Sequence, residues 1–331
     1  MRSKLPLLVT ILLFVLMYGL GSAFFPGFFA LQTFYYLLID NAFLIIMGVG
    51  MTFVILSGGI DLSVGSLLAL TTMVVSSLIE KNQMHPFLVI PLVLLMGTGF
   101  GAFMGFLIQA FKIPPFIVTL GGLYLARGLC YVVSIDTIAI THPIYNFLSQ
   151  YKIRIIGNNF ISVNVVLAFI MVLLGVFLAH YTKFGRTVYA IGGNERSAML
   201  MGLPVGRTKV LIYAFSSFCA TLSGIAFTFY MRSGYALHGV GMEMDAIAAV
   251  AIGGTLLTGG HGYVIGTLFG VLISGTIQYL IMFQGTLNAW WTKIAIGALV
   301  CIFCLFQKLL TVRQDSQPSL RSKRQPEAPV A

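Results

Sequence analysis

Charged residues are scarce in this chain: only 8% of its 331 residues are Asp, Glu, Lys or Arg, whereas 58% are hydrophobic. A soluble domain covers its surface with charge, but a surface that faces lipid must avoid it, because a charge at the bilayer centre costs several kcal/mol. The composition therefore excludes an ordinary soluble protein and indicates an integral membrane protein that crosses the bilayer many times.

The motifs of nucleotide and metal chemistry are also missing. No Gly-Lys pair occurs anywhere in the chain, so it has no Walker A loop to hold nucleotide phosphates. No His-Glu-x-x-His or paired-aspartate motif occurs, and the histidines are scattered: His85, His142, His180, His238 and His261. We therefore expect no catalytic residues, no cofactor and no metal site in this chain.

Cysteine offers little redox or metal chemistry either. All four cysteines fall within apolar stretches: Cys130, Cys219, Cys301 and Cys304. The last two have the Cys-x-x-Cys spacing of a redox or metal motif, but no second ligand pair accompanies them. We interpret the cysteines as packing residues and expect no disulfide.

Long apolar stretches dominate the rest of the sequence. A helix needs about 20 residues to cross the hydrocarbon core, which is about 30 Å thick. Stretches close to this length lie near 5–25, 87–111, 117–134, 161–180, 210–230 and 289–310. Two longer apolar regions, 41–79 and 243–283, are each interrupted by a glycine turn, and we interpret each as two segments. The sequence predicts an all-α polytopic membrane protein with about ten transmembrane helices.

The two glycine turns form an internal repeat. Leu56-Ser57-Gly58-Gly59 is followed, after four residues, by Val64-Gly65-Ser66-Leu67. The arrangement recurs 201 positions later, where Leu257-Thr258-Gly259-Gly260 precedes Ile265-Gly266-Thr267-Leu268. Matching Gly-interrupted segments of transporters often lie on the transport path, although glycines can equally serve helix packing alone. Counting crossings makes the two copies parallel, unless one of the turns is re-entrant.

A second group of small residues follows the spacing that lets two helices approach closely: Gly97, Gly99, Gly101 and Gly105. We interpret this group as a packing surface. Its partner helix lies either within the chain or in a second subunit.

The formal net charge of +10 comes mostly from three basic clusters. One precedes the first apolar stretch, one crowds the loop 181–209 and one follows the last stretch: Arg2 and Lys4; Lys183, Arg186, Arg196, Arg207 and Lys209; Lys308, Arg313, Arg321, Lys323 and Arg324. Ten crossings place all three clusters on one side of the membrane, and the positive-inside rule makes that side cytoplasmic. The charge therefore predicts cytoplasmic N- and C-termini and gives no reason to expect a nucleic-acid partner.

Among the charged residues inside or beside the apolar stretches we single out four: Asp61, Arg127, Glu243 and Asp245. If a helix begins at Leu62, Asp61 is its N-cap; a gate or an inter-subunit contact is the alternative. Arg127 either faces the bundle interior with a partner or snorkels to the outer surface. Glu243 and Asp245 either contact the hydroxyls of a sugar or a partner's basic residues, or are charges at a helix N-terminus. All four are candidate residues of a translocation path or gate.

The basic loop 181–209 contains a short helix with definite ends. Asn194 can cap its start, Glu195 suits its first turn and Gly202 suits a left-handed C-terminal position. A helix bounded at both ends can present residues 199–201, Met-Leu-Met, as an apolar knob to a cytosolic protein.

These features resemble the permease subunits of bacterial ribose-type ABC sugar importers, over residues 5–312. The stretch from Gly58 to Ser66, Gly-Gly-Ile-Asp-Leu-Ser-Val-Gly-Ser, is similar to the most recognisable part of that family. The segment 185–194, which ends in Tyr-Ala-Ile-Gly-Gly-Asn, resembles its coupling loop, which docks in a cleft of the ATPase subunit. The resemblance implies that six residues couple the chain to an ATPase: Gly192, Gly193, Asn194, Glu195, Ala198 and Gly202.

Four further stretches resemble one of the two permeases of the galactofuranose importer. They are Asp40-Asn41-Ala42-Phe43-Leu44, His142-Pro143-Ile144-Tyr145, Gly234-Tyr235-Ala236-Leu237 and Trp290-Trp291-Thr292-Lys293-Ile294-Ala295-Ile296-Gly297. They favour galactofuranose as the substrate.

The resemblance implies a subunit that is not itself an enzyme and that imports a monosaccharide through the bacterial inner membrane. Residues 1–312 would form the permease domain and 313–331 a disordered cytoplasmic tail. Its partners would be a cytoplasmic ATP-binding subunit, a second homologous permease in a heterodimer and a periplasmic sugar-binding protein. The alternatives are a permease for another monosaccharide such as ribose, a membrane-embedded transferase or a channel, although no filter sequence is visible.

Overall fold

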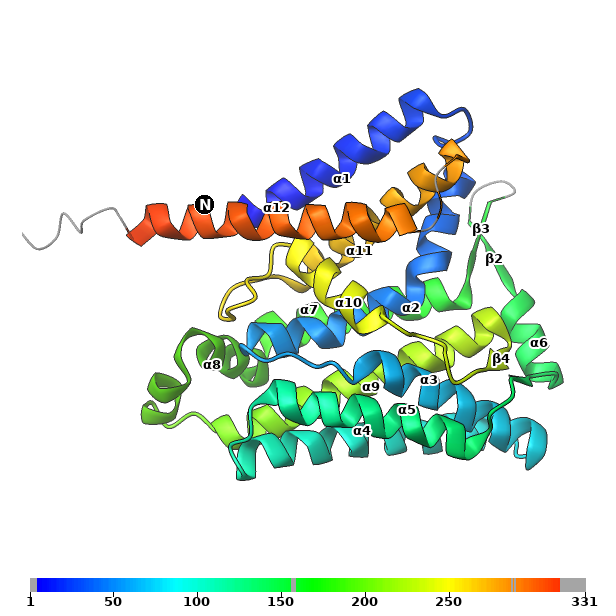
Figure 1. The fold of residues 1–331 in the computed structure, drawn as a ribbon, viewed down its shortest axis with the longest axis horizontal. Helices are drawn as coiled ribbons and strands as arrows, with labels where there is room; N and C mark the ends of the chain where they lie inside the picture. The colour runs from blue at the N-terminus through cyan, green and yellow to red at the C-terminus, as the bar shows by residue number, and fades with distance from the viewer. Residues whose placement is uncertain (1–4, 156–158, 287, 289, 316–331) are drawn as a thin grey trace, which may run out of the picture.

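The computed structural model describes residues 5–155, 159–286, 288 and 290–315, and the chain within them is a helical bundle (Figure 1). The helices are α1 Leu5–Phe24, α2 Leu31–Leu56, α3 Val64–Ser76, α4 Pro86–Ala110, α5 Pro115–Val133, α6 Pro143–Gln150, α7 Val163–Tyr181, α8 Lys183–Leu200, α9 Val205–Met231, α10 Met242–Ile252, α11 Val264–Gln284 and α12 Trp290–Asp315. A π-helix, η2 Ser77–Lys81, continues α3. Eight helices within the described residues are long and apolar enough to cross a membrane, which confirms the all-α polytopic class.

All ten predicted segments are present, but one of them is only half as long as a crossing requires. The regions 41–79 and 243–283 divide at their glycine turns as predicted, into α2 and α3 and into α10 and α11. α10 has 11 residues, about 16 Å at 1.5 Å per residue, against a core about 30 Å thick. Gly241 before it and Gly254 after it have φ angles of +84° and +88°, which a continuing helix cannot adopt. The chain reaches α10 through the non-helical residues 235–241.

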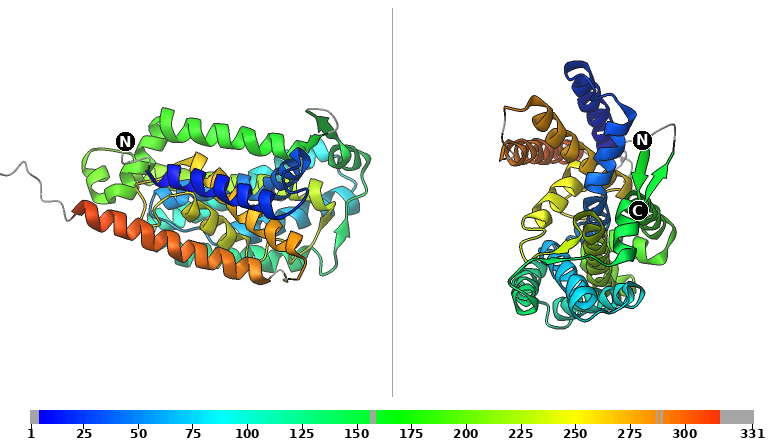
Figure 2. Two further views of the ribbon diagram at one scale, coloured as in Figure 1. Left: turned by 90° about the horizontal axis from the view of Figure 1, so that it is seen from above. Right: turned by 90° about the vertical axis from the view of Figure 1, so that its right-hand side faces the viewer.

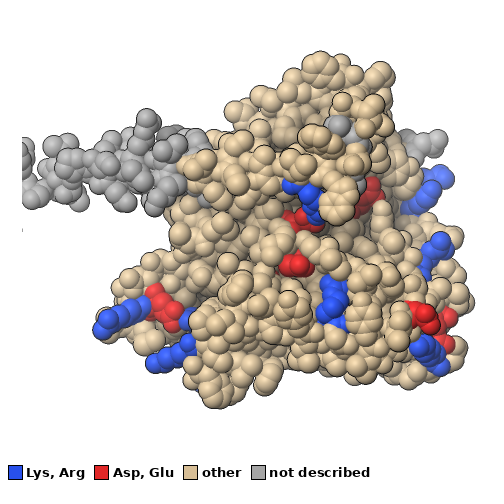
Figure 3. All heavy atoms as spheres, viewed as in Figure 1, with Lys and Arg blue, Asp and Glu red and all other residues tan. Residues whose placement is uncertain are grey.

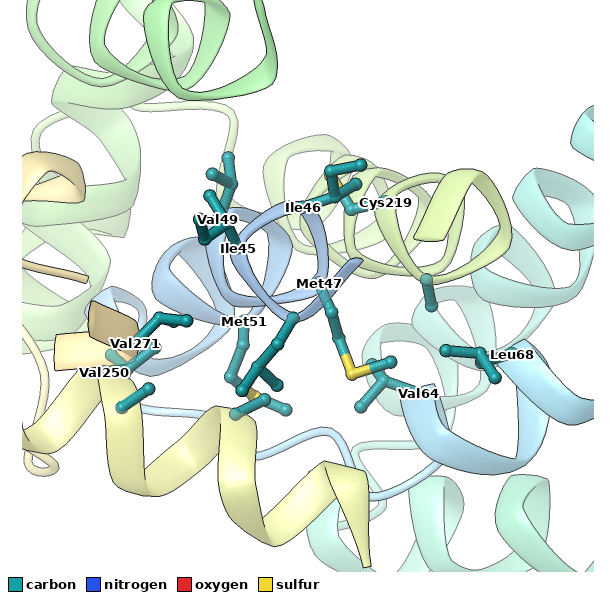
Figure 4. Packing of buried hydrophobic residues seen from close by; sticks show 14 of the residues in the cluster. Ile45, Ile46, Met47, Val49, Met51, Val64, Leu68, Cys219, Val250 and Val271 are labelled. Atoms are coloured by element: carbon teal, nitrogen blue, oxygen red, sulfur yellow. The ribbon is translucent and has the colours of Figure 1, made fainter. Parts of the chain in front are cut away.

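α2 is the central helix of the bundle. Within its most apolar window 89% of the residues are buried, against 17% for α1 and 28% each for α4 and α5. Its side chains point toward α3, α9, α10 and α11, so that they pack on several sides at once (Figure 4). A helix that is apolar all round belongs in the interior of a large protein. α1, α4 and α5 leave the most surface for lipid.

The glycines of α4 pack inside the chain. A Cβ atom on Gly97, Gly101 or Gly105 would come within 3.0 Å of α9, so the two helices approach closely because these residues lack a side chain. A Cβ on Gly99 would meet nothing within 4 Å. The predicted packing surface is therefore a contact between α4 and α9 of the same subunit, and Gly99 lies outside it.

The two ends of the bundle differ. One end carries α8, together with the start of α1 and the end of α12 (Figure 1). The other carries α6 and two small antiparallel sheets, β1 Ile138–Ala139 with β4 Ser233–Gly234 and β2 Lys152–Arg154 with β3 Phe160–Ser162. Viewed along the bundle, α1 and α12 lie on the side opposite α3, α4 and α5 (Figure 2, right). α1 begins and α12 ends toward the α8 end, which is consistent with basic clusters on one side of the membrane.

The expected boundary between the permease domain and the tail, at residue 312, lies within α12, which extends to Asp315. Residues 316–331 of the predicted tail and residues 1–4 lie outside the described residues.

Candidate functional site

The two matched glycine turns meet at one place, beside α8. The amide of Gly260 donates to the carbonyl of Leu56 at 2.9 Å. A Cβ on Gly259 would lie 2.7 Å from the Gly58 nitrogen and 3.1 Å from the Gly192 Cα atom. Gly58, Gly259 and Gly260 have φ angles of +81°, +87° and +75°, which glycine adopts without strain. We call Gly58, Gly192, Gly259 and Gly260 the glycine junction; it joins both turns to α8 through backbone contacts.

α8 consists of two helices that meet at an extended residue, Asn194, with φ −164° and ψ 107°. The side-chain oxygen of Asn194 accepts a hydrogen bond from the Ser197 amide at 2.8 Å, so the predicted N-terminal cap is present. Glu195 lies in the first turn after it and forms a 2.7 Å ion pair with Lys209 of α9. The second half of α8 therefore starts where the sequence predicts.

The C-terminal end of α8 is also closed as predicted. Gly202 has φ +76°. The amide of Leu203 donates to the carbonyl of Ala198 at 3.2 Å, and the amide of Gly202 donates to that of Met199 at 3.0 Å. These two bonds form a Schellman motif, which satisfies the last carbonyls of the helix. Ala198 is fully buried in a small cluster with Val205, which fixes the short helix to the start of α9.

An apolar knob projects from this short helix. Met199, Leu200 and Met201 expose 57%, 83% and 68% of their surface. They lie at the end of the molecule, where the basic residues of the loop 181–209 also lie, so they are not placed against the apolar middle of the bundle. Three consecutive exposed apolar side chains at a capped helix end form a patch of the kind found where a protein contacts another protein or a membrane.

Asp61 is fully buried between α2 and α3. One carboxylate oxygen accepts hydrogen bonds from the amide of Ser63 at 3.0 Å and from its hydroxyl at 2.6 Å. The other accepts from the hydroxyl of Ser216 on α9 at 2.8 Å. The predicted N-cap role is wrong, because α3 begins at Val64 with Ser63 as its N-cap. Asp61 instead holds the non-helical turn against α9.

Arg127 contacts the non-helical segment that precedes α10. Its guanidinium donates to the carbonyl of Ala236 and, at 2.9 Å, to the carbonyl of His238. The side chain is half-buried and is therefore paired with protein backbone rather than extended into lipid.

Glu243 and Asp245 both lie in the first turn of α10, where acidic residues complement the helix dipole. Glu243 packs against the start of α3, where a Cβ on Gly65 would collide with its carboxylate. Its Oε2 atom is buried and has no hydrogen-bond partner among the described residues. Asp245 forms a 2.6 Å ion pair with Lys293 of α12.

Three of the four candidate path residues therefore come together. Arg127, Glu243 and Asp245 lie around α10, and charged side chains gather in the middle of the face that carries this helix (Figure 3). Asp61 is separate, since it is buried among α2, α3 and α9.

Sequence reasoning did not select Asp40 as a site residue. Its carboxylate accepts hydrogen bonds from the hydroxyls of Tyr230 at 3.1 Å and Tyr279 at 2.5 Å. The signal that singled out Arg127, an ionisable residue inside an apolar stretch, also applies to Asp40. Its tyrosine partners could not be found from sequence, because they lie 190 and 239 positions away.

Comparisons with known proteins agree with this architecture. A protein family described as "Branched-chain amino acid transport system / permease component" matches residues 33–304. The chain is 53% identical to the inner membrane ABC transporter permease protein YjfF of Escherichia coli K12, over 96% of both chains. It is 41% identical to the fructose import permease protein FruG of Bifidobacterium longum, over 93% of this chain and 92% of that one. It is 35% identical to the ribose import permease protein RbsC of Escherichia coli K12, over 84% of both. No solved structure matches the chain.

Proposed function

The chain belongs to the family of sugar permeases of ATP-binding-cassette importers, and we propose that the sugar it carries inward is galactofuranose. The substrate assignment rests on the four stretches that resemble a galactofuranose permease. The observation that carries it is that two of these stretches, 40–44 and 290–297, contribute residues to one cavity of the bundle. Ribose, fructose and D-allose, which appear in the names of relatives, are the alternative substrates.

The second half of α8 is the coupling helix that docks in the ATPase subunit. Gly192, Gly193, Asn194, Glu195, Ala198 and Gly202 form or bound it. The exposed residues 199–201 supply the apolar contact, and closed hydrogen bonding at both ends lets the helix move as one rigid body. The glycine junction, which contains Gly192 from the first half of α8, offers a route by which that movement reaches α3 and α11.

The face that carries α10 borders a path shared with a second permease. Arg127, Glu243 and Asp245 support this placement, because a charged side chain in contact with lipid at the bilayer centre costs about 2.5–3.5 kcal/mol on insertion scales. Protein or water must therefore cover this face. One coupling helix serves one ATPase domain, whereas an ABC transporter closes its nucleotide sites between two. The galactofuranose resemblance favours a different, homologous chain as the second permease.

The importer is complete only with its other subunits. A cytoplasmic ATP-binding subunit supplies the nucleotide chemistry for which this chain has no Walker A sequence. A periplasmic sugar-binding protein delivers the sugar at the end that carries α6 and the two small sheets.

The decisive experiment measures uptake of labelled galactose, which contains the furanose form in solution, by cells that lack the chromosomal importer. We expect uptake when this chain, the ATPase, the second permease and the binding protein are expressed together, and none when either permease or the ATPase is omitted. Competition by unlabelled ribose, fructose, allose or leucine identifies the substrate class. Galactose-insensitive uptake of ribose or leucine would overturn the substrate, and full transport without the second permease would overturn the heterodimer.

Topology has its own test. Reporter fusions should place the loop 181–209 in the cytoplasm and the loop 135–160 in the periplasm, as the positive-inside rule predicts. Fusions at both loops that report the same compartment would contradict the model of crossings.

A further inference from the structure

A cavity of about 550 Å³ lies between α2, α10, α11 and α12, and Tyr230 of α9 also lines it. Its volume falls within the range of small-molecule sites, about 300–1,000 Å³. Polar side chains from all four helices line it: Asp40, Asn41, Asp245, Ser274, Gln278, Thr292 and Lys293. Carboxylate, amide, hydroxyl and ammonium groups are unfavourable in contact with lipid, because each unpaired polar group there costs free energy.

Asp40 is the most strongly fixed group in this cavity. Both of its oxygens already accept one tyrosine hydroxyl each, from Tyr230 and Tyr279. A carboxylate offers about four acceptor positions, so about two remain for a ligand. The two tyrosines hold the carboxylate in one orientation, which lowers the entropic cost of forming further hydrogen bonds to it.

The neighbouring groups extend the site. The amide nitrogen of Asn41 donates to the carbonyl of Leu37 at 2.9 Å, which fixes the orientation of this side chain in the cavity wall. The rings of Phe43 and Tyr230 lie 6.0 Å apart and give the cavity an aromatic wall, against which the C–H face of a sugar ring can pack. The cavity thus combines a flat apolar surface with several fixed acceptors, which suits a ring that carries many hydroxyls.

The charges around the cavity favour a neutral ligand. Lys293 is paired with Asp245, which leaves the carboxylate of Asp40 as the uncompensated charge of the lining. An anionic ligand such as a sugar phosphate or a sugar acid would be repelled by it.

We propose that this cavity binds one neutral monosaccharide, with Asp40 as the main acceptor of its hydroxyls and with Tyr230 and Tyr279 as positioning residues. This assignment rests on the proposed function, because it makes the cavity a sugar-binding site on the translocation path. Asp40 lies 16 positions before the end of α2 at Leu56, or about 24 Å from the glycine junction at 1.5 Å per residue. The proposed sugar-binding site therefore lies in the half of the bundle away from α8.

A second cavity leads to the same carboxylate. It measures about 370 Å³, is lined in part by Lys152 and Phe160 of the β2–β3 sheet, and shares Asp40 and Tyr230 with the first cavity. The two cavities adjoin at Asp40 and Tyr230, and we expect a water-soluble reagent added on the side of the β2–β3 sheet to reach the sugar site through them.

The test uses the assembled importer in right-side-out membrane vesicles. The four cysteines of this chain are first replaced by alanine. A cysteine is placed in the cavity (Thr292→Cys) or, as a control, in the loop after α11 (Thr286→Cys), which is exposed and outside the cavity. Both are treated from outside with a membrane-impermeant methanethiosulfonate. We expect 10 mM galactose to slow the labelling of the cavity cysteine at least threefold and to leave the loop cysteine unchanged. Equal labelling with and without sugar would overturn the assignment.

A kinetic test separates binding from folding. Asp40→Asn keeps the size of the side chain but removes the charge that strengthens hydrogen bonds to sugar hydroxyls, so KM for uptake should rise about tenfold. Tyr124→Phe, at an exposed tyrosine of α5, should keep the parent's KM. If Asp40→Asn prevents assembly, the labelling test still decides the assignment, because it leaves Asp40 in place.

The outcomes distinguish the two levels of the proposal. If the parent importer transports sugar while Asp40→Asn keeps the parent's KM, the cavity is not the sugar-binding site, and the proposed permease function stands. If the parent transports none of the tested sugars while leucine is carried, the proposed function itself is wrong.

Discussion

The turn after α2 and the turn after α10 carry the same Leu-(Ser/Thr)-Gly-Gly pattern, but different parts of the molecule hold them. The first is tied to the bundle interior, because Asp61 accepts a hydrogen bond from Ser216 of α9. In the second, Gly262 stands at the position that corresponds to Asp61, and its carbonyl accepts a 2.8 Å hydrogen bond from Tyr189 of α8. One turn is therefore anchored to the core and the other to the helix that carries the coupling segment.

The helices that precede the two turns also differ, in length and in burial. α2 has 26 residues and is buried along most of its length, whereas α10 has 11 and is flanked by glycines with positive φ. A long buried helix resists displacement, because many packed side chains must move with it. From this comparison we expect a movement of α8 to displace α10 and α11 further than α2 and α3.

The largest effect is expected where the anchor of the first turn is removed. Asp61→Asn leaves the hydroxyls of Ser63 and Ser216 without their charged acceptor, and we expect the free energy of unfolding to fall by about 3 kcal/mol. Thermal unfolding of the detergent-purified protein measures it. Asp136→Asn, at an exposed aspartate between α5 and β1, is the matched control. Equal melting of both variants would mean that Asp61 does not anchor the turn.

A smaller effect is expected at the glycine junction. A methyl group on Gly192 would collide with the Leu56 carbonyl, whereas one on Gly193 would meet nothing within 4 Å. Gly192→Ala should therefore reduce sugar uptake at least tenfold while the chain stays in the membrane, since overpacking costs about 1–3 kcal/mol. Gly193→Ala should transport nearly like the parent, although a much larger side chain there is expected to disturb docking of the ATPase. The junction has no coupling role if Gly192→Ala also transports normally.

The anchor of the second turn should matter less for stability than for coupling. Burial, with a smaller contribution from Tyr263, raises the pKa of Tyr189 to about 12, so its hydroxyl stays protonated and donates to Gly262. Tyr189→Phe removes this bond, at a cost of about 1 kcal/mol. We expect several-fold less sugar carried per ATP hydrolysed, measured in proteoliposomes, with Tyr181→Phe at an exposed position as the control. An unchanged ratio would show that the second turn does not follow α8.

The smallest effect is expected at the ion pair between Lys209 and Glu195. Their side chains expose 20% and 45% of their surface, and exposed pairs contribute about 0–1 kcal/mol. Lys209→Ala should lower the melting temperature by less than Asp61→Asn does and should leave the ratio of sugar to ATP within twofold of the parent. A larger loss of coupling than in Tyr189→Phe would make this pair, rather than the second turn, the link to α8.

Local signals predicted what local interactions determine. The cap at Asn194 and the left-handed Gly202 were predictable because their hydrogen bonds reach only a few residues along the chain. The apolar stretches predicted the segments for the same reason. The shortness of α10 was also indicated locally, because the apolar region begins at 243 and the glycine turn follows at 258–260, but the expected count of ten crossings nevertheless includes this segment.

Contacts between residues far apart in the sequence could not be predicted. Asp61 was expected to cap a helix, but its bond to Ser216, 155 positions away, favours a non-helical turn. Asp40 carried the same sequence signal as Arg127, but its two tyrosine partners could not be predicted because they lie 190 and 239 positions away. The role of the small residues of α4 was correctly predicted as packing, yet only the structure identifies α9 as the partner helix.

The central position of α2 has a consequence for biosynthesis. Its buried surface is covered largely by α7, α9 and α11, all of which are made later. α9 begins about 150 residues after α2 ends, which at 5–20 residues per second leaves an interval of about 7–30 s. During that time α2 has left the ribosome while most of its eventual neighbours do not yet exist. Chains truncated before α9 should therefore expose α2 to the proteases of membrane quality control.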